Sequence, residues 1–130
     1  MIARVAVVLA AVVAIAWLAV MERDHRLVTN GIHLSGHLDA SPHNFARADN
    51  DLKDAGYLNP DTRPELFRSL LYQGGGHLRR SVELALDVTK REPDNIRAWA
   101  QVLALSPHYA PAQVKPALAA LRRLDPLEAP

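Results

Sequence analysis

The chain has 130 residues, of which 49% are apolar and 22% are charged, and it contains no cysteine. These values predict one globular domain and exclude disulfides, thiolate catalysis and zinc–thiolate sites. The formal net charge is only +1, from 15 basic and 14 acidic residues. A nucleic-acid partner is not expected, because it would require an excess of basic residues gathered on one face.

The first predicted element, at residues 1–21, is a transmembrane anchor. Residues 2–21 are apolar except for Arg4, and about 20 such residues in a helix cross a hydrocarbon core of roughly 30 Å. Trp17 suits an aromatic anchor at the membrane interface. Two alternatives stay open. One is a cleaved secretory signal, since residues 14–16 (Ala-Ile-Ala) resemble a cleavage site, and the other is a buried core helix.

The charges around this segment specify its orientation only weakly. Arg4 lies on one side, and Arg23 and Arg26 lie on the other, so the positive-inside count is nearly tied. A short tail before the span and a long domain after it are typical of a signal-anchor that exports the domain. We therefore expect a single-pass membrane protein whose soluble domain is extracytoplasmic.

Residues 22–40 carry apolar side chains at loose helical spacing. Gly31 and Gly36 lower the helix propensity of this part of the chain. It is interpreted either as a stalk that continues the anchor or as the first helix of a degenerate repeat.

Residues 41–126 alternate amphipathic stripes with Pro and Gly breaks, which predicts a series of helices before a tail at residues 127–130. Ser41 is a suitable N-cap, and Gly56 is a suitable residue to follow a helix. Residues 74–76 are all glycine and predict a turn between two helices. The predicted helices run from Ser41 to Gly56, from Asp61 or Thr62 to the glycine turn at residues 74–76, from Leu78 to Arg91, from Asp94 or Asn95 to Ser106, and from Pro111 to Arg123.

Three prolines recur at a fixed interval. Pro60, Pro93 and Pro126 are each separated by 33 residues, and a period of this size is typical of stacked helix-turn-helix units. In this respect the chain resembles the tetratricopeptide repeat (TPR) family, whose repeats are about 34 residues long. The resemblance covers roughly Ser41 to Pro126. It implies a short array of antiparallel helical hairpins in this part of the chain. Together with the N-terminal transmembrane helix predicted above, the expected fold class is all-α.

The match to the family pattern is partial. Leu66 and Trp99 stand where the family has a large residue near the start of the first helix, and Trp99 is accordingly expected in the core. Leu70 and Leu103 stand where the family has a small residue, which is a departure from the pattern. Ser81 matches a small residue of the second helix. The chain therefore resembles a degenerate array.

The resemblance also implies where a partner would bind. In this family the first helices of the repeats line the concave surface, and several polar residues of this chain fall on those helices. Partner carboxylates are expected to be held there by bidentate guanidinium contacts, while the alternative is that these residues only keep the surface soluble. The candidate partner-binding residues are Arg63, Phe67, Arg68, Arg97 and Gln101.

Other chemistry is only weakly indicated. His33 and His37 have the spacing that places two imidazoles on one helix face, but a metal site needs a third ligand, and Gly36 weakens the helix between them. Asp49 and Asp54 are interpreted as part of a solvated helix face. No nucleophile motif or catalytic pair is recognised. No enzymatic activity, cofactor, metal or small-molecule substrate is expected.

The expected function is that of a membrane-anchored protein–protein interaction adaptor or scaffold at the cell envelope. A structural subunit of a larger membrane complex is the first alternative. A periplasmic module that binds a metal or ligand through its histidines is the second.

Overall fold

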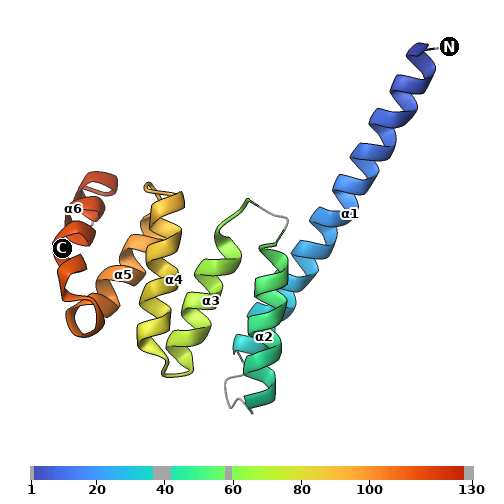
Figure 1. Cartoon of the computed structure of the whole chain (residues 1–130). Coiled ribbons are helices and arrows are strands. Elements are labelled where there is room, and N and C mark those ends of the chain that lie inside the picture. Colours follow the sequence, from blue (N-terminus) through green and yellow to red (C-terminus); the bar gives the residue numbers. More distant parts are fainter. Residues whose placement is uncertain (1, 37–41, 58–59, 128–130) are drawn as a thin grey trace.

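The computed structural model describes residues 2–36, 42–57 and 60–127, and in these ranges all regular structure is helical (Figure 1). The prediction of an all-α fold is confirmed. The elements are α1 (Ile2–Gly36), α2 (Pro42–Ala55), α3 (Arg63–Gly74), α4 (Leu78–Arg91), α5 (Ile96–Tyr109), the short 3-10 helix η1 (Pro111–Gln113) and α6 (Val114–Leu124).

The helices form a row in chain order, with α1 extending away from one end and α6 at the other (Figure 1). Each helix packs against its neighbour in the sequence, and α1 also contacts α3. Short connections join α3 to α4 and α4 to α5, so these neighbours run in opposite directions, as short loops between helices require.

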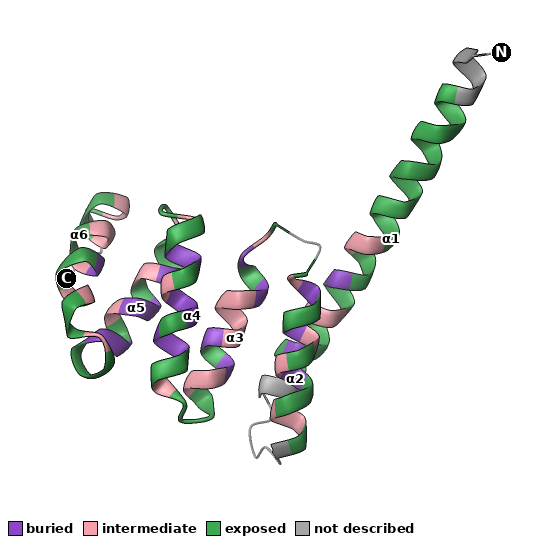
Figure 2. Ribbon diagram, viewed as in Figure 1, coloured by how far each residue is buried: buried purple, intermediate pink, exposed green. Residues whose placement is uncertain are grey.

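Helix α1 has 35 residues and changes character along its length. The first part is exposed and apolar (Figure 2), with Val7 at 69% and Leu18 at 66% exposure. Over Ala6–His33 the helix is long and apolar enough to cross a membrane. The second part packs against α2. Residues 22–36 therefore continue the apolar segment in one helix and pack against α2.

Gly31 lies within α1 and does not interrupt it. A Cβ atom at this position would lie 2.6 Å from Cγ of Leu52, which is fully buried in α2. The glycine is needed for the close approach of the two helices, and their packing outweighs its low helix propensity. His37, the second histidine of the predicted pair, and Ser41, the predicted N-cap, lie outside the described residues.

The buried side chains form clusters between successive helices (Figure 2). One cluster joins Ala48 and Leu52 of α2 to Leu71 of α3. Another joins α4, α5 and α6, and the partly buried Trp99 packs against it. The indole N–H of Trp99 donates a hydrogen bond to the carbonyl oxygen of Pro93 at 2.8 Å. Trp99 therefore packs against the core and fixes the turn before α5.

Most predicted helix boundaries agree with the structure to within a few residues. Asn95 caps α5, since its side-chain oxygen accepts a hydrogen bond from the Ala98 N–H at 3.1 Å. The predicted end of this helix at Ser106 is wrong, because α5 continues through Pro107 to Tyr109. A proline within a helix removes one backbone hydrogen bond. Because Pro107 lies only two residues before the end of α5, this loss does not prevent the last turn of the helix from forming.

Candidate partner-binding groove

Two adjoining recesses lie on the side of the molecule formed by α1, α3 and α5. The smaller has a volume of about 180 Å³ and lies between α3 and α5. The larger has a volume of about 510 Å³ and lies between α1 and α3. Arg63, Phe67 and Arg97 border both. We call the combined surface the α1/α3/α5 groove, and its other main lining residues are Asp24, Val28, Leu66, Leu70 and Gln101.

Four of the five predicted partner-binding residues line this groove: Arg63, Phe67, Arg97 and Gln101. Arg63 is exposed, and its guanidinium binds the Asp61 carboxylate. Arg97 is also exposed, and no ion pair or hydrogen bond engages its side chain among the described residues. Arg97 is therefore the cation of this group that is most available to a partner.

Arg68 lies outside the groove. Its Nε atom donates to Oδ1 of Asp49 on α2 at 2.7 Å, and its side chain is only 13% exposed. Burial works against the charged form of Arg68, but the hydrogen bond to Asp49 and the charge of that carboxylate outweigh it, so its pKa lies above the ordinary value. This arginine links α3 to α2. The prediction that Asp49 belongs to a solvated helix face is wrong, because its side chain is only 18% exposed in this pair.

Tyr72 belongs to the same link. Its hydroxyl donates to Oδ2 of Asp49 at 3.1 Å. Burial and then the negative charge of Asp49 raise the pKa of this hydroxyl. Asp49 thus accepts hydrogen bonds from two side chains of α3, which holds the α2–α3 contact in one register.

Gln101 lines the groove but has little exposed surface, at 9%. Its Nε2 atom donates to Oε1 of Gln73 at 2.7 Å and to Oγ of Ser81 at 3.3 Å. The amide is thereby engaged by α3 and α4. Gln101 has a structural role at the base of the groove, and the sequence pattern alone does not distinguish it from Arg97.

Asp24 is a groove residue that the sequence analysis missed. It is 2% exposed, and neither carboxylate oxygen has a hydrogen-bond partner among the described residues. The sequence signal was weak, because Asp24 lies among the charged residues that follow the anchor, where a carboxylate is ordinarily solvated. Only the packing of α1 reveals its burial.

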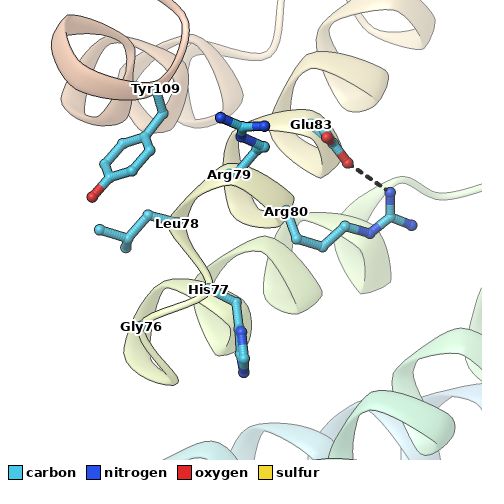
Figure 3. Close-up of a pocket in the computed structure, with 7 residues that line it drawn as sticks. All are labelled: Gly76, His77, Leu78, Arg79, Arg80, Glu83 and Tyr109. Carbon is cyan, nitrogen blue, oxygen red and sulfur yellow. Dashed lines mark hydrogen bonds and ion pairs between the residues drawn. The ribbon is translucent and has the colours of Figure 1, made fainter.

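A separate recess of about 410 Å³ lies where α4 begins, and Figure 3 shows its lining residues. Arg79 and Tyr109 face it from α4 and α5, while Arg80 is paired with Glu83 at 2.9 Å. Gly76 adopts a φ of 78° in the turn, a left-handed conformation that favours glycine. Gly75 and Gly76 therefore form the predicted turn between α3 and α4, whereas Gly74 is the last residue of α3.

The described residues contain no group of three or more His, Cys, Asp or Glu side chains placed to hold a metal ion. His33 is exposed on α1.

In comparisons with known proteins, no family model, no curated protein and no solved structure matches the chain.

Proposed function

We propose that the chain is a membrane-anchored, TPR-like adaptor that binds a protein partner in the α1/α3/α5 groove. The observation that carries this proposal is the groove itself, which combines exposed apolar surface with the unpaired guanidinium of Arg97. Apolar burial supplies most of the free energy of protein association, and the charged rim supplies specificity.

The anchor is residues 2–21 of α1. The side chains of residues 6–19 are exposed, and water is an unfavourable environment for so large an apolar surface. Trp17, at 55% exposure, lies near the end of the span, as an interfacial aromatic does. Because α1 continues into the groove without a break, the groove lies close to the membrane surface. We propose that it faces the extracytoplasmic side.

The TPR-like arrangement is supported by the pairing of helices. Pro60 and Pro93 precede α3 and α5, and Pro126 follows α6. The chain is then three helical pairs, α1/α2, α3/α4 and α5/α6, in which the first helices line the groove. The first pair lacks a corresponding proline because its first helix is the continuation of the anchor.

The binding surface has an apolar base and a basic rim. Leu66, Phe67 and Leu70 provide the apolar side chains from α3, and Leu70 is 44% exposed. Arg97 offers its donors to a carboxylate of the partner. A permanently docked subunit would need a continuous apolar patch beyond the anchor. In the part that the structure describes, the exposed large apolar side chains beyond the anchor are divided among separate elements and their ends: Ile32, Tyr57, Leu70, Ile96, Tyr109 and Leu127. This favours the adaptor.

The proposal is tested by placing a glutamate at positions in the groove and at a position outside it. Arg97→Glu and Leu70→Glu, made separately in the full-length protein, are expected to reduce partner recovery about tenfold or more after crosslinking in native membranes. Arg97→Glu would place a carboxylate against the carboxylate of the partner, and such like-charge contacts are strongly unfavourable. Leu70→Glu would bury an unpaired carboxylate on the apolar base. Far-UV circular dichroism checks that each variant is folded.

Arg79→Glu is the matched control, because Arg79 is exposed on α4 and lies outside the groove. It should leave recovery nearly unchanged. Equal losses from Arg79→Glu and Arg97→Glu would contradict binding in the groove and favour a subunit packed on several sides.

A further inference from the structure

Asp24 carries a buried carboxylate that forms no ion pair or hydrogen bond within the part of the chain that the structure describes. It lines the larger recess of the groove, is 2% exposed, and has no hydrogen-bond partner for either oxygen among the described residues. A buried carboxylate is ordinarily satisfied by a cation or by several donors, because desolvation otherwise makes the charged form very unfavourable. Both carboxylate oxygens of Asp24 are therefore without the partners that such a group requires.

The basic residues around the recess do not supply the missing partner. Arg63 binds Asp61, and Arg97 comes from α5 without an ion pair to Asp24. His25 also lines the recess, on the same helix, and is exposed. None of these side chains forms a hydrogen bond with the Asp24 carboxylate.

We propose that the groove takes up a lysine or arginine side chain of the partner polypeptide, with Asp24 as its counter-ion. The inference rests on the proposed binding of a partner in this groove. Val28 and Phe67 line the same recess and provide apolar surface for the aliphatic stem of the incoming side chain. The cation reaches the carboxylate after a rotamer change in the lining, as is common when interfaces form.

The same arrangement specifies the charge pattern of the partner. Asp24 on α1 requires a basic group, whereas Arg97 on α5 requires an acidic one. A segment with a basic residue over α1 and an acidic residue over α5 satisfies both. A segment with charges of one sign satisfies only one of them and is repelled by the other, which gives the groove a means of selecting its partner.

The cation site is tested without the partner, using small cations that mimic the two side chains. Full-length ¹⁵N-labelled protein in non-ionic dodecyl maltoside micelles is titrated with n-butylammonium or methylguanidinium chloride. Saturable shifts are expected at the amides of Asp24, Val28 and Phe67, and neutral n-butanol should not cause them. Absence of saturable shifts with both cations would overturn the proposal.

Asp24→Asn and Glu22→Gln form the matched pair of variants. Both remove a carboxylate from α1, but Glu22 is exposed and already paired with Arg26 at 2.7 Å. Asp24→Asn should abolish the saturable shifts, and Glu22→Gln should preserve them. Shifts that persist in Asp24→Asn would overturn the assignment.

Thermal stability gives a second readout on the same variant. Replacing a buried carboxylate that lacks hydrogen-bond partners with an amide of similar size should leave the Tm of Asp24→Asn unchanged or raise it. A marked fall would show that the carboxylate is satisfied within the fold, and would overturn the proposal. A lipid headgroup is the alternative occupant, and nanodiscs of two compositions test it. If transfer from phosphatidylcholine to phosphatidylethanolamine nanodiscs causes the same amide shifts as n-butylammonium, the occupant is a lipid headgroup and the proposal is overturned.

Failure of the Asp24 cation site can be distinguished from failure of the proposed partner binding in the groove. Leu70→Glu should abolish partner recovery while leaving the n-butylammonium shifts intact, since Leu70 does not line the recess that contains Asp24. Loss of the shifts in Asp24→Asn with unchanged partner recovery would show a cation site that the partner does not use, and would overturn the proposal while leaving the groove test unaffected.

Discussion

At the scale of single residues, the two arginines Arg68 and Arg97 show how position in the fold separates residues of the same type. Both lie on helices that contribute to the groove. Arg68 turns toward α2 and is paired with Asp49, while Arg97 faces the groove and is exposed. One contributes to the stability of the chain, and the other is available for recognition.

The paired arginine leads to a stability prediction. Asp49→Ala is expected to lower the free energy of unfolding by about 1–3 kcal/mol, because it leaves the partly buried Arg68 and Tyr72 without their acceptor. Urea denaturation of the full-length protein in micelles, followed by circular dichroism, measures the change.

Asp87→Ala serves as the control, since Asp87 pairs with Lys90 on the exposed surface, with side-chain exposures of 57% and 73%. Exposed pairs contribute about 0–1 kcal/mol. If the two variants are equally stable, the α2–α3 link contributes nothing beyond an ordinary surface pair.

At the scale of elements, α3 and α4 approach closely at two serines. The Ser69 hydroxyl donates to the Ser81 carbonyl oxygen at 2.9 Å, and the Ser81 hydroxyl donates to the Ser69 carbonyl oxygen at 2.7 Å. Both residues are fully buried. Ser69 is therefore a small residue at the α3–α4 contact, whereas the next residue, Leu70, faces the groove.

This contact predicts a size-dependent effect. Ser81→Ala should cost about 1–2 kcal/mol through the lost hydrogen bond. Ser81→Leu should cost about 1–3 kcal/mol more, because the larger side chain separates two closely packed helices. Thermal and urea unfolding of the two variants measure the difference.

Val114 provides the comparison, since it lies 33 residues after Ser81 and is partly exposed on α6. Val114→Leu should change stability by less than about 1 kcal/mol. Tolerance of leucine at both positions would show that the α3–α4 distance is not limited by Ser81.

At the scale of the whole molecule, α1 connects the apolar segment to the helical row in one continuous element. A partner bound in the groove would then be held close to the bilayer. The geometry depends on the helix staying unbroken at Gly31, where the contact with Leu52 forms.

The anchor leads to a fractionation prediction. The full-length chain should stay with membranes after washes in high salt or alkaline carbonate, because about 20 apolar residues are removed from water. Immunoblotting of pellet and supernatant measures the distribution. Val12→Arg with Val13→Arg should weaken insertion, at about 2.5–3.5 kcal/mol for each arginine near the centre of the span.

Ala112→Arg is the control, because Ala112 is exposed in η1, away from the apolar segment. It should leave the distribution unchanged. Recovery of a soluble protein that begins at Trp17 would instead establish cleavage after Ala16 and contradict an uncleaved anchor.

Local features of the sequence determined the helical class, most helix boundaries and the long apolar element. Apolar spacing, prolines and glycines act on residues within a few turns of one another, so these predictions need no knowledge of the fold. The same reasoning placed Arg63, Phe67 and Arg97 on helices that border one groove.

Only the tertiary structure decided which polar side chains are paired within the fold and which are not. Asp49 and Arg68 are 19 residues apart, and Gln73 and Gln101 are 28 apart. Gly31 and Asp24 likewise acquire their roles from the packing of α1. Such contacts depend on the rotation and separation of packed helices, and a one-residue change turns a side chain on a helix by about 100°. Helical periodicity therefore predicts the apolar face of each helix, whereas the pairing of its polar residues is set when the helices pack together.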